Sequence, residues 1–197
     1  MKRFKRILLI TLALVILAIT GGIVFSPYGN HDGFDYKLVE HTVEIDAPAD
    51  SVFKYLGNSD NARHWSVFVD HITPLNADSF PDGMPGGRRR CFSNPEETGL
   101  QWDELITIVE PGKRRQLVCY DLKDFPMAAK NLATEQLYAP LGPWKCRLTF
   151  TLFFYEGKST WWDELKTYFG AYRVKSIYEQ NMANIERLTE ERYAQKK

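Results

Sequence analysis

The last third of the chain, residues 159–193, limits most strongly what this protein can fold into, because it predicts one long amphipathic helix. Apolar side chains recur there at helical spacing, and no proline interrupts them. The predicted stripe consists of Trp161, Leu165, Tyr168, Phe169, Tyr172, Val174, Tyr178, Met182, Ile185 and Leu188. Such a helix is about 50 Å long, whereas a ten-residue strand spans about 33 Å. The helix is therefore expected to overhang any sheet on which it packs.

The opposite end of the chain predicts a transmembrane anchor. Residues 7–25 carry no charge and are almost all apolar, a length that just spans a bilayer core. A basic segment, residues 1–6, precedes them and contains Lys2, Arg3, Lys5 and Arg6. This excess of positive charge predicts a single-pass protein with a cytoplasmic N-terminus and an extracytoplasmic domain. Residues 26–36, with their proline and glycines, predict a short tether to that domain.

A cleaved signal peptide, followed by secretion, is the alternative interpretation of the N-terminus. The basic start and the apolar run at residues 7–19 also fit the first two regions of a signal peptide. However, Ile23, Val24 and Phe25 continue the apolar run past a small-residue cleavage point near Thr20. That continuation favours an uncleaved anchor.

The remaining chain has the size and composition of one globular domain. The 197 residues are 44% hydrophobic, which is enough for one well-formed core but not for two. The formal net charge is zero, but without the four N-terminal bases 21 basic and 25 acidic residues remain, a net charge of −4. No nucleic-acid partner is therefore expected.

The three cysteines predict neither a zinc site nor a disulfide. Cys91, Cys119 and Cys146 have no CxxC spacing and no neighbouring histidine pair. They fall on the third, fifth and seventh predicted strands, and such strands lie about 9–10 Å apart, beyond the roughly 7 Å that a disulfide allows. We expect three buried, unpaired thiols.

Seven strand candidates precede the long helix. The first, residues 37–46, alternates, with Val39, His41, Val43 and Ile45 on one face, which is typical of a half-buried strand. Two short helices follow, one opened by Pro48 and one near residues 61–65. The six further strand candidates are residues 67–75, 88–93, 100–109, 115–122, 132–138 and 146–155.

Several of these segments together resemble the START-like superfamily, which includes polyketide cyclases and lipid-transfer domains. They are VEIDAPADSVFKYLGN at residues 43–58, HWS around Trp65, WDELITIVEPGKRRQLVCY at residues 102–120, and the terminal helix. The resemblance implies an α+β helix-grip fold for residues 37–195. In that fold, a strongly curved seven-stranded antiparallel sheet surrounds the long helix and encloses a cavity. The superfamily has no invariant catalytic motif, so the resemblance indicates a fold more strongly than an activity.

The implied cavity makes several side chains candidates for its wall. In residues 101–109 both faces mix polar and apolar groups, so Glu104 or Asp103 can face inward, where a buried carboxylate is a candidate acid or base. The predicted ligand-binding side chains are Trp65, Trp102, Glu104, Tyr120, Tyr138, Phe150, Leu165, Phe169 and Tyr172. The catalytic candidates are His41, Glu104 and Tyr138, although a hydrogen-bonded core or cavity histidine is the favoured interpretation of His41.

Basic residues gather at one end of the predicted sheet. Three sets of basic residues lie at strand starts or at a turn, and an antiparallel order brings them to the same end. They are Arg88, Arg89 and Arg90, then Lys113, Arg114 and Arg115, then Lys145 and Arg147. In the resembled superfamily, loops at this end commonly border the cavity entrance. These residues therefore predict a basic mouth that points away from the anchor, with Arg88, Arg90 and Arg115 binding an anionic head group. An ordinary solvated rim is the alternative.

The sequence thus favours a membrane-anchored binding or carrier module for a hydrophobic or amphipathic small molecule. No GxSxG, P-loop, HExxH or Rossmann fingerprint occurs, so an enzyme is not favoured, and no cofactor or metal is expected. A cyclase- or hydrolase-like enzyme that uses cavity acid or base groups is the first alternative. A protein-interaction module with an exposed apolar patch near residues 182–188 is the second.

Overall fold

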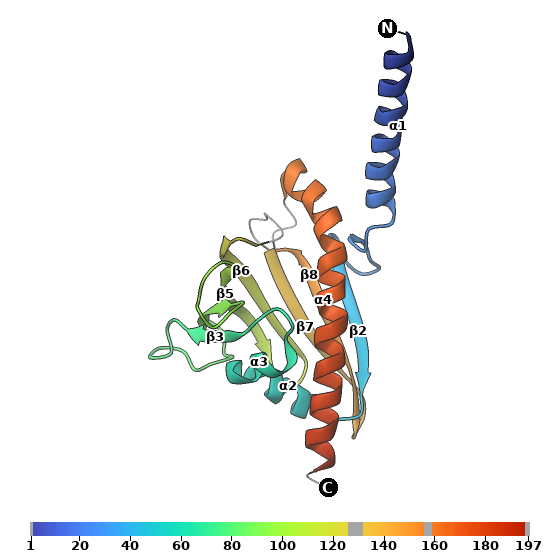
Figure 1. The fold of residues 1–197 in the computed structure, drawn as a ribbon. Helices are drawn as coiled ribbons and strands as arrows, with labels where there is room; N and C mark the ends of the chain where they lie inside the picture. The colour runs from blue at the N-terminus through green and yellow to red at the C-terminus, as the bar shows by residue number, and fades with distance from the viewer. Residues whose placement is uncertain (1, 126–131, 156–158, 196–197) are drawn as a thin grey trace.

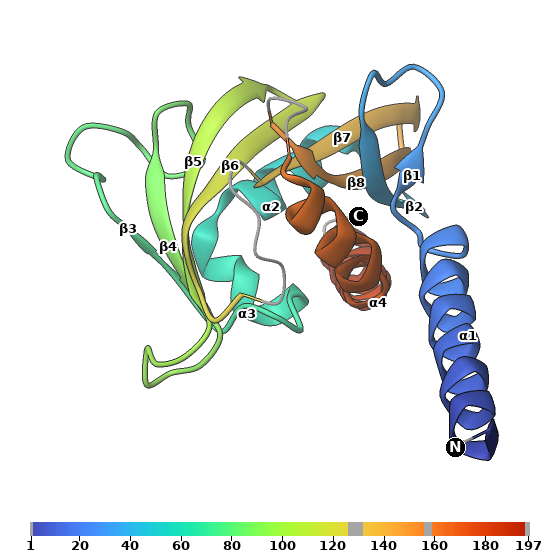
Figure 2. The same cartoon turned by 90° about the horizontal axis from the view of Figure 1, so that it is seen from above.

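The structure, a computed structural model, describes residues 2–125, 132–155 and 159–195. One antiparallel sheet curves around the long C-terminal helix, and a separate N-terminal helix projects from one end of the domain (Figure 1). Seen from above, the sheet arches from β2 to β3, with α4 and the short helices on its concave side (Figure 2). The predicted α+β helix-grip fold is therefore confirmed.

The described residues form four α-helices, one 3₁₀ helix and eight strands. The helices are α1 (Lys2–Val24), α2 (Ala49–Gly57), the 3₁₀ helix η1 (Ser59–Asn61), α3 (Ala62–Trp65) and α4 (Trp161–Ala194). The strands are β1 (Gly29–Asn30), β2 (Lys37–Ile45), β3 (His71–Pro74), β4 (Arg88–Phe92), β5 (Gln101–Glu110), β6 (Arg114–Lys123), β7 (Leu132–Gly142) and β8 (Lys145–Phe154). The sheet has eight strands instead of the predicted seven. The additional strand is β1, whose two residues are too few to show an alternating pattern in the sequence.

Antiparallel pairing throughout the order β1-β2-β8-β7-β6-β5-β4-β3 determines which strand ends lie together. The end of β8 pairs with the starts of both β2 and β7. In the same way, the end of β6 pairs with the start of β5. These strand ends therefore lie at one end of the sheet. Because α1 leads into β1 and β2 here, we call this the α1 end of the sheet. The turns between β5 and β6 and between β7 and β8 lie at the opposite, distal end.

The long helix α4 confirms the prediction made for residues 159–193. The hydroxyl of Thr160 accepts a hydrogen bond from the N–H of Asp163 at 3.1 Å, and Asp163 and Glu164 place negative charge in the first turn. The helix packs against β2, α3 and α2. Met182 and Ile185 are fully buried, so the interaction patch predicted near residues 182–188 is wrong.

Helix α1 is continuous over 23 residues and is long and apolar enough to span a membrane or to be a signal sequence. Most of it stands clear of the domain, as predicted, but its last turn touches α4. The hydroxyl of Tyr172 donates to the carbonyl oxygen of Gly22 at 3.0 Å. A Cβ on Gly22 would lie 2.5 Å from Cε1 of Phe169, so glycine permits this close approach.

Residues 26–36, the predicted tether, pack onto the domain. Tyr28 is buried with its ring centroid 5.3 Å from that of Tyr168, and Ser26 Oγ donates to the carbonyl oxygen of Tyr168 at 2.6 Å. Further along, Tyr36 stacks on Phe153 on the outer face of the sheet, with 4.7 Å between the ring centroids. Packed side chains therefore join the end of α1 to the sheet.

Candidate ligand-binding site

The concave face of the sheet, α3 with the residues that follow it, and the middle of α4 enclose a cavity of about 130 Å³, which we call the central cavity. Its wall is mainly apolar. The apolar and aromatic side chains that line it are Leu56, Ala62, Trp65, Phe68, Val69, Ile72, Trp102, Leu117, Phe125, Phe150, Leu152, Val174, Ile177 and Tyr178. A mainly hydrophobic and aromatic wall with a few polar groups is typical of small-molecule sites.

Among the described residues, lining side chains of the central cavity are partly exposed at the α1 end of the sheet, and Asn58, which follows α2, is exposed on another side. Phe68 and Val69, before β3, and Phe125, after β6, are partly exposed lining residues, whereas Leu117, Leu152 and their neighbours deeper in the sheet are buried. The Phe68 and Phe125 rings meet edge to face with 5.9 Å between their centroids. The start of β3 and the end of β6 lie at the α1 end by strand pairing.

A buried ion pair is the main polar feature of the wall. Arg89 on β4 pairs directly with Glu104 on β5, and Arg89 Nε donates to Glu104 Oε2 at 2.7 Å. The other carboxylate oxygen accepts a hydrogen bond from Trp102 Nε1 at 3.0 Å. On the far side, Arg89 Nη1 donates to Ser59 Oγ at 3.3 Å, and Ser59 in turn donates to Asp82 Oδ1 at 2.7 Å.

This pair keeps hydrogen-bonding capacity for a ligand. Burial opposes the charge on Arg89, but the attraction and hydrogen bond of Glu104 outweigh it and raise the pKa of Arg89, so the guanidinium stays charged. A guanidinium has five N–H groups, and two of them donate to the residues that the structure describes. An ionised carboxylate has about four acceptor positions. On Glu104, Arg89 and Trp102 donate to two of them, and the Cys91 thiol also hydrogen-bonds this carboxylate.

Two thiols also border the central cavity. Cys91 and Cys119 are buried and line its floor. Burial raises the pKa of each thiol well above its usual value, so both remain protonated and weakly nucleophilic. All three cysteines are unpaired, as predicted.

Four predicted ligand-binding side chains line the central cavity. They are Trp65, Trp102, Glu104 and Phe150. Trp65 adds a buried Nε1 that has no hydrogen-bond partner among the described residues. Of the two carboxylates that the sequence left open, Glu104 faces inward, whereas Asp103 faces outward and binds Arg90 with 2.6 Å between Arg90 Nε and Asp103 Oδ1.

The predicted basic mouth is not at the cavity opening. Arg88 and Arg90 lie on the outer face of β4, where Arg88 Nε donates to the hydroxyl of Tyr120 at 2.8 Å. Tyr120, another predicted ligand-binding residue, therefore also lies outside the central cavity. Alternation along β4 explains the error, because Arg89 shares the inner face with Cys91, while Arg88 and Arg90 share the other.

Arg115 and Tyr138 are buried, but beneath α2 rather than in the cavity wall. Arg115 Nη1 donates to the Tyr138 hydroxyl at 3.3 Å, and its guanidinium lies 4.3 Å from the Phe53 ring centroid. Burial lowers the pKa of Arg115 and raises that of Tyr138. Helix α2 covers this distal end, so Arg115 cannot serve as a rim residue there.

Three predicted residues of α4 lie outside the central cavity. Leu165, Phe169 and Tyr172 occupy the first turns of the helix, where Phe169 and Tyr172 contact α1. The cavity-lining part of α4 begins later, at Val174. The overhang of α4 was predicted, but the part of the helix that meets the cavity was placed too early.

His41, a predicted catalytic candidate, faces α4 rather than the central cavity. Its Nδ1 lies 3.1 Å from Lys175 Nζ. Partial burial, followed by the positive charge of Lys175, lowers the pKa of His41. A neutral histidine that accepts a hydrogen bond from Lys175 fits the favoured interpretation from the sequence, a hydrogen-bonded core or cavity histidine.

The sequence analysis counted Arg89 only as part of the basic run at the predicted mouth, and it missed the lining residues Phe68, Phe125, Ile177 and Asn181. Cys91 was expected to be buried, and two-residue alternation from Cys91 would have placed Arg89 on the same inner face. The loop residues Phe68 and Phe125 have no comparable periodic signal. No cluster of potential metal ligands occurs among the residues that the structure describes.

The fold and the apolar central cavity define a helix-grip, ligand-binding class of domain. Residues 37–190 match the family model described as polyketide cyclase / dehydrase and lipid transport, and the chain belongs to this family. None of the curated proteins matches the chain.

Solved structures share this fold at low sequence identity. A protein from Thermobifida fusca has a TM-score of 0.60 at 15% identity, over 77% of this chain and 92% of its own. Norcoclaurine synthase from Thalictrum flavum, in complex with dopamine and hydroxybenzaldehyde, has a TM-score of 0.54 at 15% identity, over 79% and 87%. A START superfamily protein from Mycobacterium smegmatis has a TM-score of 0.54 at 16% identity, over 81% and 99%. At these identities the likeness concerns the fold.

Proposed function

We propose that this protein is a membrane-anchored binding or carrier module whose central cavity holds a hydrophobic or amphipathic small molecule. One observation carries the proposal, namely a mainly apolar cavity with the buried Arg89–Glu104 pair on one wall. An apolar wall favours a hydrophobic body, and a buried polar group orients a polar substituent.

The charge of the pair indicates the kind of polar group that fits. Arg89 and Glu104 neutralise each other, and an anionic group beside Arg89 would also meet the Glu104 carboxylate. An uncharged group that both donates and accepts hydrogen bonds, such as a hydroxyl, can instead contact both partners. The proposed ligand therefore has a neutral polar group, which replaces the anionic head group expected from the sequence.

The volume of the central cavity limits how a ligand is held. At about 130 Å³ it is smaller than the roughly 300–1,000 Å³ of most small-molecule pockets. A small ligand fits inside, whereas the apolar part of a larger one would project between Phe68, Phe125 and α4. This second arrangement suits a carrier that receives its ligand at the opening.

Helix α1 supplies the proposed membrane anchor, with the four preceding bases on the cytoplasmic side. Intact mass of the purified protein should show that residues 1–25 are retained, and a reporter fused to the C-terminus should be extracytoplasmic. A mature chain that begins after residue 20 would contradict anchoring and support secretion.

Native mass spectrometry of the full chain, purified in detergent after exposure to a membrane extract, tests the ligand proposal. The unaltered protein should retain a small molecule. Ile177→Trp should abolish retention by filling the cavity, whereas Gln180→Trp, on an exposed part of α4, should not. A chain that stays empty, or equal retention in both variants, would reject binding in the central cavity.

An acid–base enzyme is the second candidate, because Glu104 lines the central cavity, unlike His41 and Tyr138. If Glu104 transfers a proton to or from the ligand, the molecule recovered from Glu104→Gln should differ covalently from that recovered from the unaltered protein. The same molecule in both samples would favour binding without reaction.

A further inference from the structure

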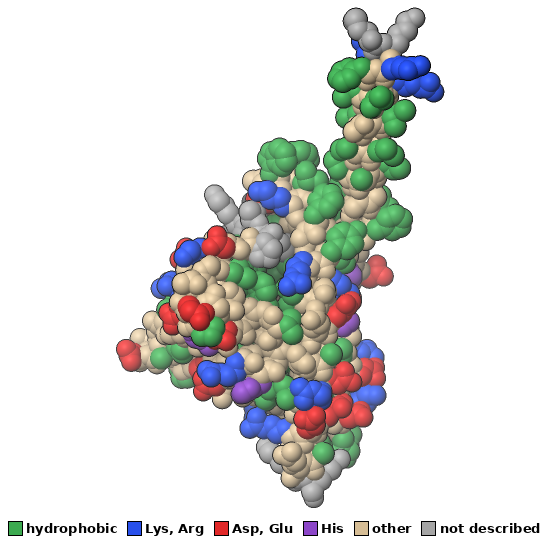
Figure 3. Space-filling model, in the orientation of Figure 1, with side chains coloured by type: hydrophobic (Ala, Val, Ile, Leu, Met, Phe, Trp, Pro, Cys, Tyr) green, Lys and Arg blue, Asp and Glu red, His purple; other side chains and the backbone are tan. Residues whose placement is uncertain are grey.

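Large aromatic side chains are exposed at the first turns of α4. Trp161 and Trp162 are 66% and 61% exposed, and their rings contact each other with 4.4 Å between the centroids. Phe169 and Tyr172, two to three turns further on, are 44% and 43% exposed. We call these four residues the aromatic tip. In the space-filling view, hydrophobic side chains gather at this end of α4 and along α1 (Figure 3).

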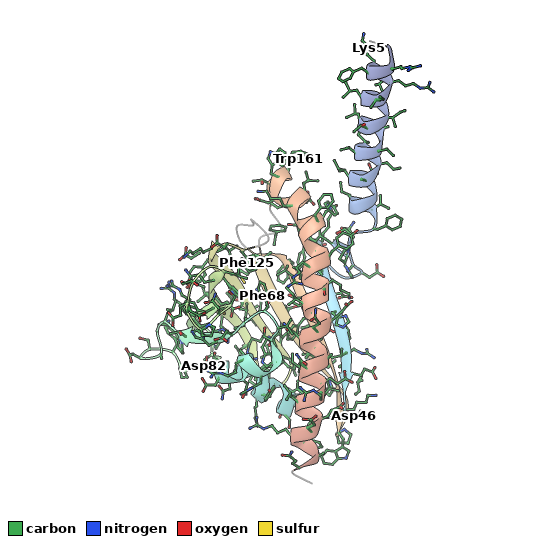
Figure 4. All side chains as sticks on the ribbon, in the orientation of Figure 1. Lys5, Asp46, Phe68, Asp82, Phe125 and Trp161 are labelled. Carbon is green, nitrogen blue, oxygen red and sulfur yellow. The ribbon has the colours of Figure 1, made fainter. Side chains whose placement is uncertain are left out.

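The aromatic tip lies beside α1. Tyr172 donates to the carbonyl oxygen of Gly22, and Phe169 contacts Gly22, so the two helices meet at the last turn of α1. From that contact, α4 continues for eight residues to Trp161, about 12 Å at 1.5 Å per residue. Both helices extend beyond the same end of the domain (Figure 1), and Trp161 lies at the free end of α4 (Figure 4). Figure 2 shows that α1 leans away from α4 beyond their contact.

We infer that the aromatic tip is a second membrane contact, inserted into the headgroup region of the bilayer that α1 spans. This inference rests on the proposed anchoring role of α1 and assigns the surface to lipid. If α1 enters the membrane near Gly22, Phe169 and Tyr172 lie at the headgroup level, and Trp161 and Trp162 reach toward the acyl chains. Tryptophan and tyrosine are the residues enriched at this level, because each has an apolar body and a polar N–H or O–H group.

The charges on the same part of α4 fit a lipid surface. Lys166 and Arg173 are exposed and lie on the helical face that also carries Trp162 and Phe169, at spacings of three and four residues. Basic side chains between aromatic ones can contact lipid phosphates while the rings enter the boundary. Glu164, in the same region, is neutralised by Lys37 at 2.6 Å.

This contact gives the central cavity an orientation. Its partly exposed lining residues Phe68 and Phe125 lie at the α1 end of the sheet, the end from which the aromatic tip also extends, and we take this side as the opening. The tip therefore holds the opening toward the bilayer, so that a ligand exchanges with lipid rather than with the surrounding solution. The sequence had predicted a mouth at the opposite end, directed away from the membrane.

Quenching by brominated phosphatidylcholine tests the inference. The full chain is placed in nanodiscs of phosphatidylcholine and phosphatidylglycerol, with and without bromine near the headgroup end of the acyl chains, and tryptophan emission is compared. The test variant is Trp161→Ser/Trp162→Ser. The control is Trp144→Ser, which removes a tryptophan of similar exposure, 58%, at the distal turn between β7 and β8.

We expect bromine to remove the same amount of tryptophan emission from the unaltered protein and from Trp144→Ser, and most of this loss to be absent in Trp161→Ser/Trp162→Ser. Equal quenching in all three proteins, or none in the unaltered one, would overturn the inference. So would a stable dimer that shields the tip from quencher, or a mature chain without α1. Ligand retention is measured separately by native mass spectrometry, so failure of this contact is distinguishable from failure of the binding proposal.

Discussion

Arg89 and Glu104 face each other across β4 and β5, with 2.7 Å between Arg89 Nε and Glu104 Oε2, and both side chains are about nine-tenths buried. The pair stands in an otherwise mainly apolar wall. Each charge therefore depends on the other, because removing one leaves its partner desolvated and uncompensated.

The first prediction concerns the stability of this pair. Arg89→Met should lower the free energy of unfolding by about 3–5 kcal/mol, whereas Arg89→Met/Glu104→Leu should recover much of the loss by removing both charges. Arg88→Met, on the exposed outer face of the same strand, should change it by less than about 0.5 kcal/mol. Chemical denaturation of the full chain in detergent measures all three, and equal losses in the single and double variants would contradict the argument.

The second prediction is a pH dependence at His41. Burial and Lys175 lower the pKa of His41 in the folded protein, so the unfolded chain binds more protons between the lowered value and the ordinary value of 6.5. Stability should therefore be complete above about pH 6.5 and fall as the pH decreases through this window. His41→Gln should remove this component of the pH profile, and Lys175→Gln should reduce it. If His41→Gln leaves the pH dependence of stability unchanged, groups other than His41 cause it.

The sequence predicted the fold better than the site because the two depend on different signals. Alternation in β2 and β8 and the period of α4 were long enough to identify each element. The predicted stripe of α4 matches its buried face at Val174, Tyr178, Met182 and Ile185, whereas Trp161, Phe169 and Tyr172 are exposed. Strand β4 has only five residues, three of them arginines, so its inner face could be found only by reference to Cys91. A shift of one residue in this alternation decides whether Arg89, or instead Arg88 and Arg90, faces the cavity.

Strand β5 shows a different limit. Its register with β6 shifts between Ile106 and Ile108, so Val109 packs against the core although strict alternation from Ile106 would turn it outward. The cavity opening depends on Phe68 and Phe125, whose positions come from loop conformation rather than periodicity. Residue spacing alone therefore predicts walls built from regular strands, but not the entrance.

The third prediction concerns the thiols. Cys91, Cys119 and Cys146 are buried and unpaired, and burial raises the pKa of Cys146 to about 11. A thiol-specific chromogenic disulfide should therefore react slowly with the native protein at neutral pH and with all three thiols after denaturation. Rapid modification of one thiol in the native state would show that its strand opens to solvent.

The fourth prediction concerns Arg115, which is 2% exposed and forms no ion pair with the described residues. Its Nε has no hydrogen-bond partner there, and burial lowers its pKa. Arg115→Met keeps an apolar stem and removes a desolvated charge, so stability should be unchanged or higher by roughly 1 kcal/mol. A loss above about 1 kcal/mol by chemical denaturation would show that the contacts to Phe53 and Tyr138 outweigh desolvation.

The last prediction concerns the segment that joins α1 to the sheet. Tyr36 stacks on Phe153 and, with Phe34, covers a small apolar cluster on the outer face that includes Leu38 and Ala133. Tyr36→Ala should lower stability by about 1–2 kcal/mol, because it removes one ring of a stacked pair and exposes the other. It should also loosen the connection between α1 and the sheet.

Quenching of the tryptophans in the aromatic tip measures how firmly α1 is connected to the sheet. In brominated nanodiscs, Tyr36→Ala should reduce quenching of Trp161 and Trp162, since a domain with a looser connection spends less time with the tip in the headgroup region. Leu75→Ala, a truncation of an exposed side chain just after β3 at the distal end, should leave quenching unaltered. If Tyr36→Ala lowers stability while quenching remains complete, the contact between α4 and Gly22 is sufficient to orient the domain, and the packing of residues 26–36 serves stability alone.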